Sequence, residues 1–363
     1  MNAFIAPLVI MVSISLILGL VLVIASRFLA EYGPCRISIK GNKDVEVIGG
    51  ETLLSSLFEN KIFIPSACGG RGSCGYCKLK VTSGGGSVLP TELPYLTPSE
   101  VVDDVRLACQ LKVKSDMEIE VPEEYLSIQE YRAEVAQSIS LTYDMKELRF
   151  RLLEPETINF KPGQYIQFHV PSTNREVVYR AYSIASLPSM AGELELIVRL
   201  VPGGIGSTYI HNLSVGDEVT ISGSCGDFFL HERSSCDILL IGGGAGMAPL
   251  KSILYSLFEK GSDRKIDLFF GVRAKKDLFY LEEFERLAKE HPNFTYTYAL
   301  SSPGEADDWK GEKGFIHLVL ERHLKEGEKR EAYLCGPPLM ADAVIKVLKE
   351  KGVDPSNIYY DKF

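Results

Sequence analysis

The chain opens with a long apolar segment that differs from everything after it. From Phe4 to Ala25 it runs for 22 residues without a charged side chain. About 20 such residues span a bilayer as a helix. A cleaved signal peptide is the alternative, but the basic region that precedes one and a clear small-residue cleavage site are both missing. We therefore expect an uncleaved transmembrane anchor over residues 1–27.

Behind this segment, short runs of alternating apolar and polar residues indicate β-strands. Apolar residues alternate on both sides of a Gly41-Asn42 turn, which predicts a β-hairpin over residues 36–47. The further elements expected here are a short helix over 52–60 and strands over 78–82 and 111–121. Together they predict a small β-rich domain over residues 33–126.

A second β-rich region follows, in which turn signals such as Pro162-Gly163 and Gly216-Asp217 separate short apolar strands. The strands expected are 132–140, 148–153, 165–170, 193–200 and 218–222. Many short strands separated by turns suggest a barrel, which we expect over residues 129–233.

After Ser234 the pattern changes to strands that alternate with helices. The elements expected are strands over 237–241, 266–271, 294–300 and 331–335 and helices over 250–258 and 340–351. Such alternation predicts a parallel sheet with helices on both faces, here over residues 235–363. The predicted fold class is therefore multidomain, α+β followed by α/β, behind an N-terminal transmembrane helix.

Composition and charge narrow the range of partners and the redox compartment. The chain carries 39 basic and 48 acidic side chains, a formal charge of −9, which argues against a nucleic-acid partner. Arg27, Arg36 and Lys40 follow the apolar segment and no Lys or Arg precedes it, so the positive-inside rule places the other domains in the cytoplasm. Thiols stay reduced there, so the eight cysteines are better explained as metal ligands or packing residues than as disulfides.

Four cysteines have the spacing of an iron–sulfur ligand set. Cys68, Cys74 and Cys77 stand as C-x5-C-x2-C in a glycine-rich loop, and Cys109 follows after 31 intervening residues. The plant-type [2Fe–2S] pattern is C-x4-C-x2-C with a distant fourth cysteine, so the first gap here is one residue longer. A structural zinc ion is the alternative, although zinc sites usually combine two C-x2-C pairs. We expect a [2Fe–2S] cluster on these thiolates, with the glycines allowing backbone N–H groups to point at the sulfurs.

Two short motifs in the barrel region favour a flavin. Arg180, Tyr182 and Ser183 form an R-x-Y-S motif, in which a guanidinium can bind a diphosphate, a ring can cover an isoalloxazine and a hydroxyl can reach flavin N5. Gly206 and Ser207 lie in a run of small residues whose backbone donors can approach phosphate. Each motif is weak alone, since a packed tyrosine and a solvated arginine give the same pattern by chance.

Two further motifs lie at the carboxyl ends of predicted strands in the last region. Residues 242–249 read GGGAGMAP and open a helix, so N–H groups near Gly244 and Gly246 can bind an anion, although the G-x-G-x-x-G pattern is incomplete. Cys335 and Gly336 belong to a CGPP run at the same sheet edge, where the thiol can pack against a nicotinamide. Ordinary turns without a ligand are the alternative in both places.

Taken in order, these motifs resemble one family across nearly the whole chain. Besides the anchor they are CGGRGSCGYC, GGGSVLPTELP, RLACQ, VPEEY, RAYS, VTISG, IGGGAGMAP, GFIH and YLCGPPLM. The series resembles the F subunit of the sodium-translocating NADH:quinone oxidoreductases, while RAYS and CGPP also resemble the wider ferredoxin–NADP reductase superfamily. The resemblance implies a plant-type ferredoxin β-grasp domain, an antiparallel β-barrel that binds FAD and a Rossmann-like domain that binds NAD.

The resemblance also implies a role for each candidate residue. The implied cluster ligands are Cys68, Cys74, Cys77 and Cys109. The implied FAD contacts are Arg180, Tyr182, Ser183, Gly206 and Ser207, with Phe363 as an aromatic residue that shields the flavin. The implied NADH contacts are Gly244, Gly246, Cys335 and Gly336. Of these residues, Ser183 and Cys335 are expected to be catalytic.

The activity implied is NADH dehydrogenation. Electrons would pass from NADH to FAD, then to the [2Fe–2S] cluster and on to integral-membrane acceptor subunits, with quinone reduced indirectly. The expected location is the cell inner membrane, with a single spanning helix and the cofactor domains in the cytoplasm. One departure from the family is the short segment between Gln167 and Arg180, which bears on docking to partner subunits rather than on electron transfer.

Two other functions share part of this pattern. A reductase that feeds an oxygenase has the same three cofactor domains but is usually soluble, and the predicted anchor argues against it. A membrane-tethered electron carrier that has lost NADH oxidation would not need the intact motifs at 242–249 and 335–338.

Overall fold

The computed structural model describes residues 7, 10–21, 32–171, 178–232, 234–304 and 308–362. Two compact units divide the chain, residues 1–127 and residues 128–363. Residues 10–21 form a helix with exposed side chains, and most of the remaining predicted anchor lies outside the described residues. Within the described ranges, no helix combines the length and the apolar character needed to cross a membrane.

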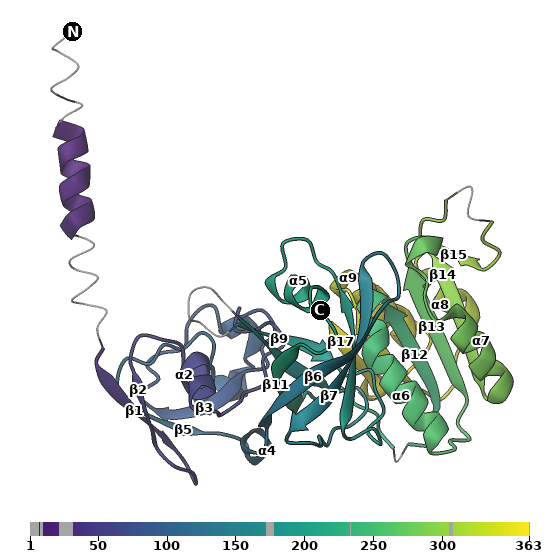
Figure 1. Cartoon of the computed structure of the whole chain (residues 1–363), viewed down its shortest axis with the longest axis horizontal. Coiled ribbons are helices and arrows are strands. Elements are labelled where there is room, and N and C mark those ends of the chain that lie inside the picture. The colour runs from purple at the N-terminus through teal and green to yellow at the C-terminus, as the bar shows by residue number, and fades with distance from the viewer. Residues whose placement is uncertain are drawn as a thin grey trace. The chain divides into compact units, whose positions relative to one another are not determined.

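A five-stranded sheet forms the centre of the first unit (Figure 1). In spatial order its strands are β2 (Val45–Ile48), β1 (Pro34–Ile39), β5 (Met117–Glu120), β3 (Lys78–Ser83) and β4 (Val105–Leu107). Strands β1 and β5 pair in parallel, and the other neighbours are antiparallel. The β1–β2 hairpin is the one predicted around Gly41-Asn42.

Helix α2 (Leu53–Glu59) supplies the apolar cover of this unit, because Leu53, Leu54 and Leu57 are all buried. It begins after Thr52, whose hydroxyl accepts a hydrogen bond from Ser55 N at 3.1 Å. The shorter helices of the unit are η1 (Leu93–Tyr95), α3 (Pro98–Val102) and α4 (Glu123–Leu126).

The strand predicted over 111–121 is shorter in the structure, where β5 covers only its second half. Side chains alternate between buried and exposed positions over 111–114 and again over 116–119, but residues 114–116 are all exposed. The backbone of the first half, however, bonds to the segment before α2, with Leu53 N donating to Leu111 O and Val113 N to Glu51 O. These single bonds make no regular ladder, so alternating burial alone predicted too long a strand.

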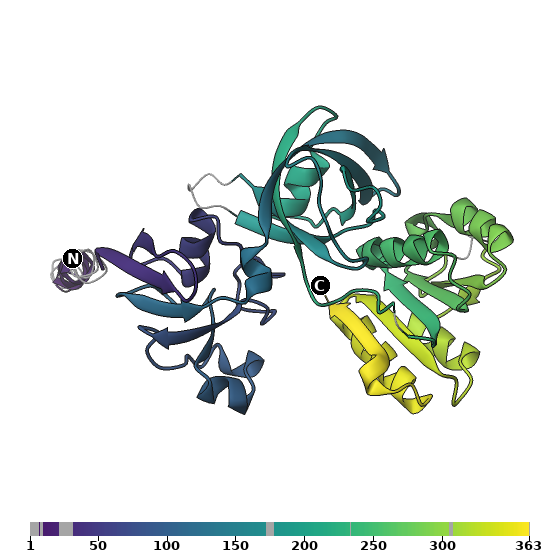
Figure 2. The ribbon, with the colours of Figure 1, turned by 90° about the horizontal axis from the view of Figure 1, so that it is seen from below.

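The second unit starts with a six-stranded antiparallel barrel (Figure 2). In spatial order its strands are β10 (Glu193–Arg199), β7 (Met145–Glu154), β6 (Gln129–Ser140), β11 (Glu218–Cys225), β8 (Tyr165–Val170) and β9 (Val178–Ser183). An antiparallel bridge between Ile184 and Leu196 joins the two edge strands and closes the barrel. Apolar side chains such as Phe150 and Phe168 fill its interior, and α5 (Ile205–His211) packs against it.

A six-stranded parallel sheet forms the rest of the second unit. In spatial order its strands are β15 (Glu312–Lys313), β14 (Phe294–Leu300), β13 (Ile266–Val272), β12 (Asp237–Gly243), β16 (Arg330–Gly336) and β17 (Ile358–Lys362). Its helices are α6 (Met247–Glu259), α7 (Leu281–Glu290), α8 (Ile316–His323) and α9 (Pro338–Glu350), with 3-10 turns η2 (Gly244–Gly246), η3 (Lys275–Asp277) and η5 (Pro355–Asn357).

The helices divide between the two faces of this sheet, as strand–helix alternation predicted. Ile238 and Leu240 of β12 pack in one apolar core with α6 and α7. Leu239 and Ile241, which point the other way, pack with α8 and α9. Both faces are therefore covered, and β12 is buried on each side.

Candidate functional site

The four candidate cluster cysteines come from separate places in the first unit. Cys68 and Cys74 lie in the loop between α2 and β3, Cys77 directly precedes β3, and Cys109 follows β4. Ala108 N donates to the Cys77 carbonyl at 2.8 Å, which joins the loop end of the site to the distant cysteine. The fold thus brings together the three-plus-one set that the sequence spacing predicted.

The loop that carries the first two cysteines needs glycine. Its four glycines have φ angles between 64° and 83°, in the left-handed region that residues with a Cβ rarely adopt; they are Gly69, Gly70, Gly72 and Gly75. Backbone N–H groups of Arg71 and Ser73 bond to the Cys68 sulfur, and that of Tyr76 bonds to Cys74. The tight turns therefore point amide donors at the sulfurs.

The four thiols lie in two pairs. A hydrogen bond from Cys74 lowers the pKa of Cys68 to about 4 and raises that of Cys74 itself. In the same way a hydrogen bond from Cys77 lowers the pKa of Cys109 to about 7, against the opposing effect of burial. In each pair one thiol therefore has a lowered pKa, and cysteine binds metal in its deprotonated form.

The two thiol pairs can be compared with the ligand sets of the two metal groups considered for this site. A tetrahedral structural zinc needs four ligands around one point. A [2Fe–2S] cluster instead takes four thiolates as two ligands on each of two irons. The donor set therefore fits the cluster.

A buried ion pair holds the strand that leads to Cys109. Arg106 in β4 and Glu92 have side chains that are 3% and 0% exposed, and their Nη2 and Oε2 atoms are 2.6 Å apart. Glu92 also accepts hydrogen bonds from Leu107 N and Leu89 N, both at 2.8 Å. Arg106 Nη1 donates to the Gly85 carbonyl at 2.5 Å. The GGGSVLPTELP segment thus packs on β4 through one carboxylate, a role that the sequence did not reveal.

In the second unit, the R-x-Y-S motif forms the end of β9 beside α5. A Cβ atom on Gly206 would lie 2.9 Å from both Arg180 Cγ and Tyr182 Oη, so a glycine is needed for this approach. Arg180, Tyr182 and Ser183 are all half-buried. The two motifs predicted for the flavin are therefore adjacent, and their guanidinium, ring and small residues fit a dinucleotide with a flat ring system.

Two contacts define the surroundings of the motif. Burial raises the pKa of Tyr182 to about 12, although Arg180 opposes the shift, so the phenol is neutral. Its ring lies edge-to-face against Phe168 with centroids 6.2 Å apart. The Ser207 hydroxyl accepts a hydrogen bond from Val201 N at 3.0 Å and so shapes the turn before α5. Its predicted contact with a diphosphate stays a prediction.

The two nucleotide motifs also meet directly. A Cβ atom on Gly246 would lie 2.1 Å from Cys335 O and 3.1 Å from Gly336 N. A Cβ atom on Gly243 would lie 2.7 Å from Met340 Sδ in α9. At Gly244, which has a φ of 57°, nothing described lies within 4 Å of the Cβ position. The glycine-rich turn therefore packs against CGPP on one side and leaves an open backbone surface at Gly244, which fits a nucleotide.

The thiol of Cys335 is deeper than the sequence suggested. Its side chain is 0% exposed and belongs to the apolar core, and burial raises its pKa. Asp361 of β17 stands opposite it in the sheet register. Burial raises the pKa of Asp361 to about 6, and no sequence motif singled this residue out. Phe363, the predicted flavin shield, lies outside the described residues.

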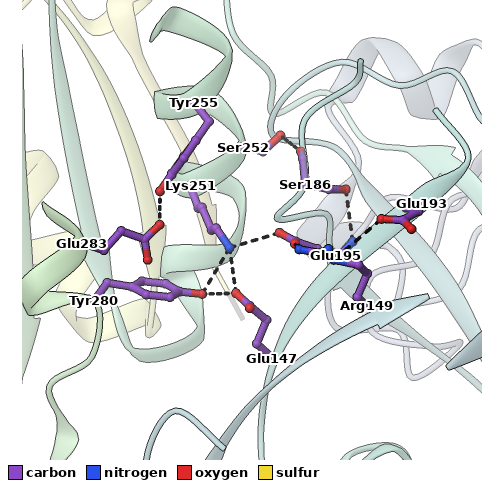
Figure 3. Close-up of polar contacts among 10 residues, drawn as sticks. All are labelled: Glu147, Arg149, Ser186, Glu193, Glu195, Lys251, Ser252, Tyr255, Tyr280 and Glu283. Carbon is purple, nitrogen blue, oxygen red and sulfur yellow. Dashed lines mark hydrogen bonds and ion pairs between the residues drawn. The ribbon is translucent and has the colours of Figure 1, made fainter. Parts of the chain in front are cut away.

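A network of charged side chains joins the barrel to helix α6 (Figure 3). Lys251 Nζ lies 2.7 Å from Glu147 Oε2 and 3.1 Å from Glu195 Oε2. Arg149 Nη2 lies 2.6 Å from Glu195 Oε1, and the Tyr280 hydroxyl donates to Glu147. No sequence pattern indicated this network, because its members come from four distant segments and form no motif.

Three family models match the chain in this order. A 2Fe-2S iron-sulfur cluster binding domain matches residues 37–114, an oxidoreductase FAD-binding domain matches 132–230, and an oxidoreductase NAD-binding domain matches 240–346. The predicted [2Fe–2S], FAD and NADH cofactors are therefore confirmed at the level of domains.

Curated relatives match the chain over nearly all of its length. The F subunit of the Na(+)-translocating NADH-quinone reductase of Neisseria meningitidis is 40% identical, with 96% of each chain covered. The F subunit of the Klebsiella pneumoniae enzyme is 40% identical over 95% of each chain. The first alignment spans 392 positions against the 363 residues of this chain, so these relatives contain segments that this chain lacks.

Solved structures show the same fold. The Amycolatopsis cytochrome P450 reductase GcoB has a TM-score of 0.72 and 30% identity, with 91% of this chain and 98% of that chain covered. The ferredoxin reductase in carbazole 1,9a-dioxygenase has a TM-score of 0.70 and 30% identity at the same coverage. One is named a cytochrome P450 reductase and the other a ferredoxin reductase in a dioxygenase, and both are less similar in sequence than the curated relatives.

Proposed function

The chain belongs to the family formed by the F subunit of Na(+)-translocating NADH-quinone reductase, and from this we infer that it is the NADH-oxidising module of a membrane-bound complex. It is an oxidoreductase that passes electrons from NADH to FAD and then to a [2Fe–2S] cluster. The main support for this function is the match to the relative over 96% of both chains. The match includes the cluster, FAD and NAD domains in the same order along the chain.

The bound groups supply the redox chemistry, since FAD accepts a hydride from NADH and a [2Fe–2S] cluster carries single electrons. The residues of the chain bind and position them. Arg180 and Tyr182 would hold FAD at the end of β9, and Gly206 would let α5 approach it. The backbone around Gly244, Gly246 and Gly336 would receive NADH, and Ser183 and Cys335 would border the reacting rings.

For the cluster, the proposed ligands are Cys68, Cys74, Cys77 and Cys109. Their support is the two thiol pairs and the amide donors that point at the sulfurs. Cys68 with Cys74 and Cys77 with Cys109 would hold the cluster as two pairs of thiolates.

We further propose that residues 1–27 anchor the chain in the cell inner membrane by a single helix, with the cofactor domains in the cytoplasm. The absence of charge from Phe4 to Ala25 supports the anchor, and Arg27, Arg36 and Lys40 support the orientation. The acceptor would then be another, integral-membrane component of the same complex, with quinone reduced further along.

The second candidate function is a reductase that feeds an oxygenase. A solved structure with 30% identity favours it, because it is named a ferredoxin reductase in carbazole 1,9a-dioxygenase and the match covers 91% of this chain. The curated relatives at 40% identity favour the quinone reductase instead.

The test of the main reaction is rapid mixing of the purified protein with NADH. We expect bleaching of the flavin absorbance, followed by the rhombic EPR signal of a reduced [2Fe–2S] cluster. A flavin that stays oxidised would contradict the dehydrogenase assignment. A reduced protein without the EPR signal would contradict the assignment of a [2Fe–2S] cluster.

Fractionation of cells separates the two candidate functions. A membrane-anchored protein stays with the membrane fraction after a high-salt wash and needs detergent for release. A variant that lacks residues 1–27 should appear in the soluble fraction. If the full chain is itself soluble, the oxygenase reductase becomes the better assignment.

A further inference from the structure

The barrel and the parallel sheet share a continuous apolar core. Met145, Ala185 and Ile197 of the barrel pack in the same cluster as Met247 and Leu250 of α6. Both domains belong to the compact unit of residues 128–363. The first turns of α6 are therefore seated on the wall of the barrel rather than exposed to solvent.

Lys251 is the one charged residue among those first turns, Met247 to Leu254, and it points into the domain boundary (Figure 3). The side chains of Lys251, Glu147 and Glu195 are 11%, 13% and 7% exposed. Burial would lower the pKa of Lys251, but Glu195 and Glu147 raise it, so the ammonium stays charged. A lysine from one domain is thus held between two carboxylates of the other.

Lys251 and its bonded neighbours lie close to both the glycine-rich turn and the R-x-Y-S motif along the chain. Along the chain, Lys251 stands five residues after Gly246 of the glycine-rich turn. The adjacent Ser252 hydroxyl donates to the Ser186 carbonyl at 2.7 Å. Ser186 follows the proposed flavin residue Ser183 by three positions, and its own hydroxyl accepts from Glu195 N at 3.1 Å. Glu195 is therefore bonded both to the helix of one motif and to the segment that follows the other.

Tyr280 supports the same network from the sheet domain. Its hydroxyl donates to Glu147 and lies 3.4 Å from Lys251 Nζ. Its φ of 60° lies in the left-handed region, which is an outlier for a bulky residue. Strain of this kind persists only where the surrounding contacts hold it. Here the strained backbone places the Tyr280 hydroxyl at the domain boundary.

We propose that Lys251, with Glu147 and Glu195, is a positioning residue that sets the NAD-binding domain against the flavin barrel and thereby the rate of hydride transfer. This rests on the proposed function. NADH gives up its hydride, two electrons and one proton, and leaves as NAD+, while FAD takes them up. Transfer of this kind depends steeply on the separation and alignment of the two rings, and a displacement of about 1 Å can cost about 100-fold in rate. Affinity for NADH depends less on the boundary, because the nucleotide motif lies within one domain.

A Lys251→Met variant tests the proposal, because methionine keeps most of the volume and removes the charge. Rapid mixing with a series of NADH concentrations gives the limiting rate of flavin reduction and the dissociation constant separately. We expect the limiting rate to fall by about 10- to 100-fold and the dissociation constant to change by less than about 3-fold. Lys251→Arg, which can still reach both carboxylates, should restore most of the rate.

Lys260→Met is the matched control. Lys260 caps the other end of α6 and pairs with Glu232, with both side chains at least half exposed. This variant removes the same charge from the same helix without touching the network, and we expect the limiting rate of the unaltered protein.

A second measurement does not depend on activity. Hydrogen exchange of the protein without nucleotide should be faster in Lys251→Met than in Lys260→Met for residues 247–253 and 184–187, which face each other across the boundary. If Lys251→Met does not bind FAD, Glu147→Gln replaces it in both measurements, with the same expected results.

The outcomes separate the inference from the proposed function. If NADH does not reduce the flavin of the unaltered protein, the proposed function fails and this inference with it. If NADH reduces the flavin of the unaltered protein and reduces that of Lys251→Met at the same limiting rate, only the inference is wrong. A raised dissociation constant with an unchanged limiting rate would also overturn it, as would an arginine variant as slow as the methionine variant.

Discussion

At the scale of single residues, the thiol pairs predict a separation between the two electron-transfer steps. We expect Cys74→Ala to abolish the cluster EPR signal, because one iron loses a ligand. Flavin reduction by NADH should keep a rate within about 2-fold of the unaltered protein, since FAD and NADH bind to the unit of residues 128–363. The measurement is EPR of the reduced protein beside stopped-flow absorbance.

Cys236→Ala is the control for this variant, because Cys236 lies in the second unit and outside the cysteine motif. It should keep both signals. If Cys74→Ala loses flavin reduction as well as the EPR signal while its FAD content is normal, the linear order of cofactors is wrong.

Asp361 predicts how stability depends on pH. Its pKa in the folded protein is raised by burial from 3.8 to about 6. A carboxyl with a raised folded pKa contributes most at pH values below its ordinary pKa, and its contribution is lost as the pH rises through about 6. We therefore expect the melting temperature of Asp361→Asn, relative to that of the unaltered protein, to rise between pH 4 and pH 7. Calorimetry over that range measures the difference.

Asp354 provides a control of opposite sign. Hydrogen bonds from the Ser356 hydroxyl and backbone N–H lower its pKa, so its contribution is present at neutral pH and is lost as the pH falls. Asp354→Asn should therefore be destabilised at neutral pH and less so in acid. If the two variants respond to pH in the same direction, the assignment whose direction is not observed is wrong.

The sequence indicated candidate residues for the site, but it did not indicate how deeply each side chain is buried. Spacing alone singled out the four cysteines as candidate ligands, because a ligand set leaves its pattern in the chain. The burial of Cys335 and the position of Asp361 depend on which strands become neighbours in the sheet, and no local pattern records that. Lys251 is missed for the same reason, since the amphipathic pattern of α6 cannot distinguish a buried lysine from a solvated one.

At the scale of elements, the ion pair of Glu92 and Arg106 predicts a large loss of stability in the first unit. Arg106→Met leaves the Glu92 carboxylate buried without its partner, which typically costs about 3–5 kcal/mol. Urea unfolding followed by loss of the cluster absorbance measures this. Replacing both residues, as in Glu92→Leu with Arg106→Met, should recover part of the loss because no unpaired charge remains.

The control for this pair is Lys40→Met, which removes an ion pair to Glu120 at the surface, where the Lys40 side chain is 74% exposed. It should leave the unfolding midpoint unchanged. If Arg106→Met is as stable as Lys40→Met, the GGGSVLPTELP segment is not held to β4 by this pair.

At the same scale, some strands with a clear period were predicted from the sequence, and other elements were missed. Strands β8 and β14 match the predicted ranges 165–170 and 294–300. Strand β9 was missed because most of its residues are half-buried, so the alternation is weak. Helix α7 was missed although its buried Phe284 and Leu287 recur at helical spacing.

At the scale of the whole molecule, the division of the chain predicts that the second unit is complete without the first. Residues 128–363 contain a closed barrel and a covered sheet, each with its own apolar core. We expect a truncated chain that starts at Ile128 to bind FAD and to be reduced by NADH, without a cluster signal. Flavin content, circular dichroism and stopped-flow absorbance measure this. A truncated chain that fails to bind FAD would show that the second unit needs the first.

The close approach of Gly246 to Cys335 constrains how this protein can diverge. Gly246 ends the 3-10 turn η2 and Cys335 lies in strand β16, 89 positions further along the chain, yet there is no room between them for a single methyl group. A mutation to alanine at position 246 is tolerated only if the backbone at 335–336 moves away first. Natural variation should therefore arise in these two segments together, and a search for altered nucleotide preference succeeds sooner by randomising both segments in one library than by changing either in turn.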